Sequence, residues 1–185
     1  MKLLKPKFWV KNYLTSLSIL LYPFTFLIDI KNLLSFFIKP KKYSKIKTIC
    51  VGNIYLGGTG KTPLVNLITR ELKKKFKSVI IKKGYLSHLD EKRLLEKNNK
   101  VFFEKNRQDS LVKAIKEKFQ LAIFDDGLQD KTIDYDLKIV CFNSITLAGN
   151  QLRLPAGPLR EKLNNLRKYD AVFITGNRCE KEFLK

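Results

Sequence analysis

The chain carries the sequence Leu56-Gly57-Gly58-Thr59-Gly60-Lys61-Thr62 shortly after an apolar run at residues 46–51 and directly before apolar residues at helical spacing. That spacing predicts a helix over about residues 61–75. A strand, a glycine turn and a helix start in this order are typical of a loop that binds phosphate groups. The alternative is a glycine turn that only connects the two elements.

Each residue type in this turn has a chemical use. Glycines permit backbone angles closed to other residues and let amide groups crowd around a polyphosphate, while the helix dipole adds positive potential. Lys61 is expected to reach the β- and γ-phosphates, and the Thr62 hydroxyl to bind magnesium. The usual pattern has a further glycine where this chain has Tyr55. The predicted phosphate-binding residues are Gly57, Gly58, Thr59, Gly60, Lys61 and Thr62.

Apolar runs alternate with amphipathic segments along the rest of the chain. Strands are predicted at residues 46–51, 78–81, 100–103, 121–124, 137–142 and 171–174. A second helix is predicted from about residue 109, with Asp109 or Ser110 as its N-cap. The alternation predicts an α/β fold: a mostly parallel sheet with helices on both faces, and ligands at the carboxyl ends of the strands.

Asp125 and Asp126 follow the apolar strand at residues 121–124 and precede Gly127. A nucleoside triphosphatase needs a carboxylate at the end of such a strand to hold magnesium, directly or through water. On its own, Asp-Asp-Gly is also a common turn or helix cap. Behind a buried strand and downstream of a phosphate loop, we interpret Asp125 and Asp126 as metal-site residues.

The chain has 37 basic and 17 acidic side chains among 185 residues, a formal net charge of +20. This surplus favours anionic partners, such as nucleic acid, acidic lipids or nucleotide phosphates. The alternative is that the lysines, which are spread along the whole chain, reflect a compositional bias of the coding sequence and form no binding face. The chain has no arginine-rich block, so recognition of nucleic-acid bases is not expected. Three scattered cysteines, Cys50, Cys141 and Cys179, indicate reduced thiols. The single histidine, His88, argues against a histidine metal site or a Ser-His-Asp triad.

The N-terminal segment differs in character from the rest of the chain. Residues 12–28 carry no charge and contain Pro23, and a second apolar piece at residues 33–38 ends in a lysine cluster around Pro40. We interpret residues 1–42 as a membrane-associating segment, either a helix in the interface or a short hairpin in one leaflet. A true membrane span and a core helix of a soluble protein are the alternatives. Residues 43–185 then form the nucleotide-binding domain.

A third motif contains two prolines and a glycine, and it ends in opposite charges at Arg160 and Glu161. It reads Arg153-Leu154-Pro155-Ala156-Gly157-Pro158-Leu159-Arg160-Glu161. The prolines and the glycine fix a rigid loop. Physical reasoning alone describes a stiff connector with a surface ion pair and predicts no role for it.

Taken together, these motifs resemble those of one family, tetraacyldisaccharide 4'-kinase, the membrane-associated lipid A 4'-kinase of Gram-negative bacteria. The resemblance rests on Val51-Gly52-Asn53-Ile54 with Gly57-Gly58-Thr59-Gly60-Lys61-Thr62-Pro63, on Lys83-Gly84-Tyr85, on Asp125-Asp126-Gly127-Leu128-Gln129, and on Leu154-Pro155-Ala156-Gly157-Pro158-Leu159-Arg160-Glu161. The last two blocks are the most specific. Trp9 and the apolar N-terminus also resemble the family's membrane-binding start.

The resemblance implies transfer of the ATP γ-phosphate to the 4'-hydroxyl of tetraacyldisaccharide 1-phosphate, giving the 1,4'-bisphosphate of lipid A biosynthesis. It implies ATP and Mg²⁺ as cofactors, an acylated disaccharide lipid as substrate, and a peripheral or monotopic position on the cytoplasmic face of the inner membrane. The family's proposed base is an aspartate whose nearest counterpart is Asp90, in Leu89-Asp90-Glu91-Lys92; a solvated helix start is the alternative reading of this segment. The implied catalytic residues are Asp90, Lys61 and Asp126, the implied metal ligands are Thr62, Asp125 and Asp126, and the implied supporting residues are Glu91, Gln129, Arg160 and Glu161.

The chain also departs from the family pattern. Lys83 stands where an arginine is usual, Asp130 where a histidine often follows, and Lys162 where a proline is usual, and the interval from Tyr85 to Asn106 is short. The family continues into a second α/β domain beyond the point where this chain ends, and three explanations stay open: a fragment, a split reading frame with a separate C-terminal half as partner, or a decayed gene. Two other functions stay open: a membrane-associated switch ATPase of the Gly-Gly-x-Gly-Lys-Thr type, which Leu56 disfavours because a lysine is usual there, and an inactive nucleotide-binding remnant.

Overall fold

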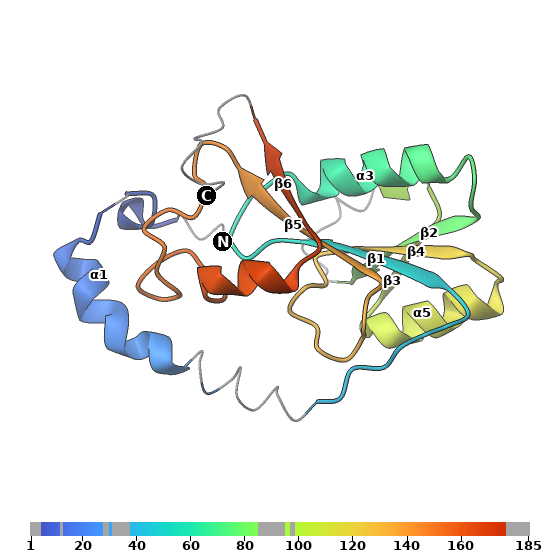
Figure 1. Cartoon of the computed structure of the whole chain (residues 1–185), viewed down its shortest axis with the longest axis horizontal. Helices are drawn as coiled ribbons and strands as arrows, with labels where there is room; N and C mark the ends of the chain where they lie inside the picture. The colour runs from blue at the N-terminus through green and yellow to red at the C-terminus, as the bar shows by residue number, and fades with distance from the viewer. Residues whose placement is uncertain are drawn as a thin grey trace.

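The computed structural model describes residues 5–11, 13–27, 30, 38–84, 95–96 and 99–176. Its centre is a six-stranded sheet with the strand order β3-β2-β4-β1-β5-β6 (Figure 1). Every neighbouring pair in the sheet is parallel. The α/β fold with a parallel sheet, predicted from alternating strands and helices, is confirmed.

The six strands coincide with the six predicted ones, and no strand end differs from its expected position by more than two residues. They are β1 (Lys47–Gly52), β2 (Ser78–Lys83), β3 (Val101–Glu104), β4 (Leu121–Asp125), β5 (Leu137–Asn143) and β6 (Ala171–Thr175). The strand β4 lies between β1 and β2, with Phe124 in register with Cys50 on one side and with Ile81 on the other. The carboxyl ends of all the strands therefore meet at one edge of the sheet.

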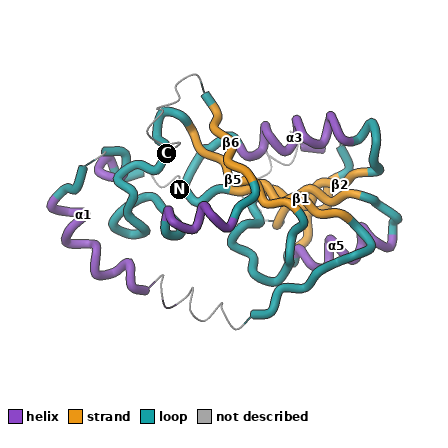
Figure 2. The backbone as a smooth tube through the Cα atoms, in the orientation of Figure 1, coloured by secondary structure: helices purple, strands orange, loops and turns teal. Residues whose placement is uncertain are grey.

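Helices cover both faces of the sheet, as predicted. The helix α3 (Lys61–Leu72) contacts β1, β2 and β4, and α5 (Arg107–Lys116) contacts β2 and β3. Figures 1 and 2 show α3 and α5 on opposite sides of the strands. The first of these helices ends at Leu72, somewhat before the expected end near residue 75.

The predicted N-cap of the second helix is wrong. The helix α5 already begins at Arg107, and its cap is Asn106, whose side-chain oxygen accepts a hydrogen bond from the Gln108 amide at 3.0 Å. Asparagine is among the strongest N-cap residues. Sequence reasoning placed the start at Asp109 because the first apolar residue of the helix, Leu111, lies more than one turn after its true beginning.

Alternation along the central strand sends successive side chains to opposite faces. In β4, Ala122 and Phe124 pack in the cluster that contains Leu111 and Ala114 of α5. The residues between them face α3: Ile123 packs with Leu64 and Val65. Because side chains alternate with a period of two, the next residue on the α3 face is Asp125. A buried carboxylate is thereby placed at the start of α3.

Two of the three cysteines are buried, as the sequence predicted, and are free thiols. Cys50 and Cys141 are both fully buried. Burial raises the pKa of the Cys50 thiol strongly, and it raises the pKa of Cys141 to about 12. Neither thiol forms a thiolate near neutral pH, so we assign both to the core rather than to chemistry.

The N-terminal region contains short helical pieces: η1 (Lys7–Trp9), α1 (Ser16–Leu21) and η2 (Tyr22–Thr25). Figure 1 shows α1 at one end of the molecule, apart from the sheet. The side chains of α1 and η2 have an inverted arrangement, in which polar residues are buried and apolar residues are exposed. The buried residues are the polar Ser18 and Thr25. The exposed side chains in and around these helices include the apolar Leu14, Leu17, Ile19, Leu20, Phe24, Phe26 and Leu27. Within the described part of the chain, no helix has the length and apolar character needed to cross a membrane.

Candidate functional site

The glycine-rich turn between β1 and α3 adopts the conformation that its glycines permit. Gly57 has φ 133° and Gly60 has φ 81°, both in the region that side chains with a Cβ disfavour. Gly60 is the N-cap of α3, so Lys61 and Thr62 form the first turn of the helix. The first backbone amides of α3 and the positive end of its dipole therefore lie beside the turn, which suits an anionic ligand.

Buried polar groups hold the turn in place from below. Asn53 is fully buried, and its side-chain amide donates to the carbonyl oxygens of Tyr55 and, at 3.0 Å, of Gly57. The Thr175 hydroxyl at the end of β6 contacts the Thr59 carbonyl oxygen at 3.2 Å. The turn is thus fixed from both β1 and β6 before any ligand binds, which reduces the ordering cost of binding.

Asp125 ends β4 directly beneath the first turn of α3. The Thr62 hydroxyl donates to its Oδ2 at 3.0 Å, and the Lys82 ammonium donates to the same oxygen at 2.7 Å. Its other oxygen, Oδ1, is buried and has no hydrogen-bond partner among the described residues. A buried carboxylate oxygen beside a threonine hydroxyl offers the hard oxygen ligands that Mg²⁺ prefers. The residues present therefore fit a magnesium site at Thr62 and Asp125.

The next residue, Asp126, is held from three sides. Its φ of 64° is left-handed, which is uncommon for a residue other than glycine and occurs often at functional sites. Its carboxylate Oδ1 lies 3.2 Å from Arg160 Nη1 and 3.9 Å from Lys61 Nζ. Its carbonyl oxygen accepts a hydrogen bond from the Arg107 guanidinium. The side chains of Lys61 and Arg160, which are distant in the sequence, therefore both lie at the Asp126 carboxylate.

The proline-rich loop reaches the site because it pairs with the glycine turn. The Leu56 amide donates to the Pro158 carbonyl oxygen at 2.8 Å, and the Arg160 amide donates to the Ile54 carbonyl oxygen at 2.7 Å. Its far end is held by the N-terminal region, where the Trp9 indole donates to the Pro155 carbonyl oxygen at 3.1 Å. The loop that physical reasoning described only as a stiff connector is therefore a wall of the site.

Gln129 and Glu161 extend the site away from the glycine turn. The Gln129 side chain accepts from Arg160 at 3.0 Å and donates to the Asn53 carbonyl oxygen at 2.9 Å. It also lies 3.4 Å from Glu161, whose carboxylate accepts hydrogen bonds from Asn165 at 2.9 Å and from Tyr169 at 2.6 Å. Burial and the neighbouring Glu161 carboxylate raise the pKa of the Tyr169 phenol, which stays a donor to that carboxylate.

The structure thus brings together most of the residues predicted for the site. Asp90 and Glu91 lie outside the described residues, so their predicted roles stay predictions. Sequence reasoning missed Asn53, Lys82 and Arg107 as site residues. For Lys82 a signal existed, because a lysine inside an apolar strand and next to a strand that ends in aspartate is a candidate for a buried ion pair.

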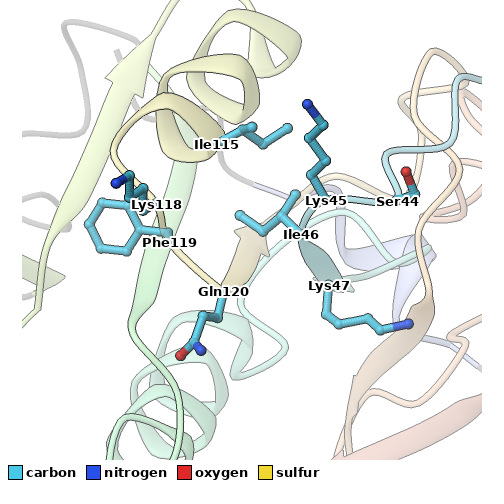
Figure 3. Close-up of a pocket in the computed structure, with 8 residues that line it drawn as sticks. All are labelled: Ser44, Lys45, Ile46, Lys47, Ile115, Lys118, Phe119 and Gln120. Carbon is cyan, nitrogen blue, oxygen red and sulfur yellow. The ribbon is translucent and has the colours of Figure 1, made fainter.

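A cavity among the described residues lies away from this site. It has a volume of about 490 Å³ and is lined by residues at the start of β1, before β4 and at the end of α5, at the amino ends of the strands. Its lysines are Lys45, Lys47 and Lys118, and Figure 3 shows their ammonium groups pointing in different directions. Side chains that do not converge form no anion site, and the chemistry of the chain gathers at the opposite edge of the sheet.

Replacing Arg107 tests how the left-handed Asp126 is held. We expect Arg107→Ala to lower the free energy of unfolding by about 1–3 kcal/mol, because the partly buried Arg107 side chain donates to the Asp126 carbonyl oxygen and to Asp130 Oδ2, and both would lose this donor. Thermal unfolding followed by circular dichroism measures the change. The matched control is Lys113→Ala, which removes an exposed ion pair to Glu104 and is expected to have little effect. Equal stability of the two variants would contradict a bracing role for Arg107.

Comparison with known proteins assigns the chain to a family. The family model for tetraacyldisaccharide-1-P 4'-kinase matches residues 11–99 and 88–185. The tetraacyldisaccharide 4'-kinase of Pelagibacter ubique (strain HTCC1062) is 51% identical, over 96% of this chain and 56% of that protein. That of Francisella tularensis subsp. novicida (strain U112) is 33% identical, over 95% of this chain and 63% of that protein.

A solved structure agrees with these sequence matches. The crystal structure of LpxK from Aquifex aeolicus in complex with ATP superimposes with a TM-score of 0.70 and 27% identity, covering 86% of this chain and 59% of that one. The chain spans a little over half the length of the relatives it matches. Because the family model matches most of its residues, the chain belongs to the tetraacyldisaccharide-1-P 4'-kinase family.

Proposed function

We propose that the chain carries the nucleotide half of an enzyme that transfers the γ-phosphate of ATP to the 4'-hydroxyl of a tetraacyldisaccharide 1-phosphate. The observation that carries the proposal is the contact of Thr62 with Asp125 at 3.0 Å, with Lys61 and Arg160 both at Asp126. These side chains meet at the mouth of a glycine turn at a helix N-terminus. The relatives that match the chain are named tetraacyldisaccharide 4'-kinase.

Each group has a role in phosphoryl transfer, which depends on alignment and charge neutralisation more than on covalent chemistry. The amides of residues 57–60 and Lys61 would hold the phosphates of ATP. Thr62 and Asp125, with Asp126 beside them, would hold Mg²⁺, which when bound neutralises charge on the phosphates. Arg160 aligns Asp126 and adds a positive charge at the point of transfer.

The acceptor side of the proposed site involves four further residues, Asp90, Glu91, Gln129 and Glu161. Asp90 would accept the proton of the sugar hydroxyl, with Glu91 beside it. Gln129 and Glu161 would support the acceptor side, because Gln129 links Arg160 to the Glu161 carboxylate.

The test is incubation of the purified chain with γ-³²P-labelled ATP, Mg²⁺ and tetraacyldisaccharide 1-phosphate in detergent micelles. Labelled phosphate in the lipid product, on thin-layer chromatography, supports the kinase. Release of phosphate without the acceptor would support a switch ATPase in its place. Neither product, together with retained nucleotide binding, would support a remnant that only binds nucleotide, and the kinase proposal would then fail for this chain.

We further propose that residues 1–42 hold the chain at the cytoplasmic surface of the inner membrane, and that residues 43–185 form the kinase domain. The inverted arrangement of α1 and η2 supports this, because exposed Leu17, Leu20 and Phe24 would enter the interfacial layer while Ser18 faces the protein. The hydroxyl of Ser18 lies 3.3 Å from the Asn150 side-chain amide. The net charge of +20 favours anionic lipid head groups.

Vesicle flotation tests the membrane proposal. We expect wild-type protein to float with vesicles that contain about one third anionic phosphatidylglycerol, and Leu20→Glu together with Phe24→Glu to lower the bound fraction severalfold, because each glutamate would enter an apolar layer. The control is Phe76→Glu together with Ile145→Glu, which places the same two charges at exposed apolar side chains outside residues 1–42. If the control lost as much vesicle binding, the effect would come from the change in net charge and not from insertion of residues 1–42, and the membrane proposal would fail.

A further inference from the structure

Lys82 and Asp125 form a buried ion pair inside the candidate site. Lys82 lies in β2, in register with Asp125 of the neighbouring strand β4. Its ammonium lies 2.7 Å from Asp125 Oδ2, and the two side chains are 10% and 0% exposed. Ile80 packs on the α3 face, so alternation places Lys82 on that same face, beneath the glycine turn.

The Lys82 ammonium and the Thr62 hydroxyl bind the same carboxylate, that of Asp125, which is proposed to hold the metal together with Thr62. Asp125 Oδ2 accepts from Lys82 and also, at 3.0 Å, from the Thr62 hydroxyl. The carboxylate therefore stands beside Thr62 with a protein cation already bound to it. In a site shielded from water, charges at this separation interact much more strongly than at the surface.

We propose that Lys82 is the resident counter-ion of Asp125 and sets the divalent-cation concentration at which the site fills. Without metal, the ammonium compensates the buried carboxylate and keeps it beside Thr62. A divalent cation held by Thr62 and Asp125 would share the carboxylate with this ammonium, so the two cations would compete for the charge of one carboxylate. This inference rests on the proposed function, and Lys82 acts in it as a positioning residue.

Opposite changes in metal affinity and metal-free stability follow from this arrangement. Loss of the positive charge removes a repulsion from the metal site, so divalent cations bind more tightly. The same loss leaves the Asp125 carboxylate buried without its counter-ion, so the metal-free protein becomes less stable. A residue with a purely structural role would lower stability without tightening metal binding.

The experiment measures Mn²⁺ binding to the full chain with ATP by electron paramagnetic resonance, after correction for Mn²⁺ bound to free ATP. Thermal unfolding with and without Mg²⁺ is the second readout. Lys82→Gln removes the charge and keeps a hydrogen-bond donor, and Lys82→Arg keeps the charge. The matched control is Lys42→Gln, which breaks a lysine–aspartate pair of 3.0 Å with Asp136, outside the site.

We expect Lys82→Gln to lower the dissociation constant for Mn²⁺ about tenfold or more. We also expect a lower midpoint of unfolding without metal and a larger rise when Mg²⁺ and ATP are added. Lys82→Arg and Lys42→Gln should bind Mn²⁺ as the wild type does. Unchanged or weaker Mn²⁺ binding by Lys82→Gln would overturn the inference while leaving the proposed function intact. Failure of wild-type protein to bind ATP at all would instead remove the proposed function, and this inference with it.

Discussion

Lys61→Ala is expected to lower the rate of phosphoryl transfer by about 10²- to 10³-fold, the loss that follows removal of one preorganised charged or hydrogen-bonding group from a transition state. Lys61 begins α3 beside the glycine turn, and its ammonium lies 3.9 Å from Asp126 Oδ1. Its positive charge therefore lies where the proposed transfer moves negative charge. Initial rates at saturating ATP and lipid acceptor measure the effect.

Lys73→Ala is the matched control for this prediction, because Lys73 caps the opposite end of the same helix. We expect its rate to stay within about twofold of wild type, as for most exposed substitutions away from a site. Circular dichroism of both variants should match the wild type, since within the described part of the chain the Lys61 ammonium has only the long contact to Asp126, at 3.9 Å. Full turnover by Lys61→Ala would show that the glycine turn does not hold the transferred phosphate.

The centre of the site could be predicted from the sequence because its parts are local. A strand, a glycine turn and a helix start fix where Lys61 and Thr62 lie, and a buried strand ending at Asp125 belongs at the same edge of a parallel sheet. Their meeting at 3.0 Å confirms that reasoning. Strand positions were equally predictable, because buried parallel strands are continuous apolar runs.

The periphery of the site could not be predicted in the same way, because it depends on contacts between distant segments. Arg107 reaches the Asp126 carbonyl oxygen from α5, and Tyr169 binds Glu161 from the chain before β6. No local pattern marks either contact. Lys82 lies between these cases, since counting alternate residues along β2 would have placed it opposite Asp125 on the α3 face.

The N-terminal region shows a further limit of prediction from the sequence. Its composition predicted apolar residues at a surface or in a core, and three arrangements stayed open. Only the structure shows that polar side chains such as Ser18 and Thr25 face the protein while their apolar neighbours face outward. The direction of an amphipathic face depends on what the helix packs against, and here that surface is the loop held by Trp9 and Asn150.

The second large effect is expected for Gly157→Ala, which should lower the free energy of unfolding by about 3 kcal/mol, the upper range for overpacking. A Cβ at Gly157 would lie 2.2 Å from Asn150 Oδ1 and 2.4 Å from the Leu152 carbonyl oxygen. The backbone at Leu152 is itself paired with Leu159, whose amide donates to the same oxygen at 3.0 Å. The new methyl group can therefore be accommodated only by moving the loop.

Moving this loop should also disturb the site, because Arg160 is placed by it. The amide of Arg160 pairs with Ile54 at 2.7 Å, and its guanidinium holds Asp126 at 3.2 Å. We expect a midpoint of thermal unfolding lower by about 6–12 °C, together with weaker ATP binding. The control for thermal unfolding alone is Gly58→Ala, because a Cβ there would meet no atom within 4 Å and φ is not in the left-handed region. If both variants unfold at the same temperature, the close packing of Gly157 does not hold the loop against the glycine turn.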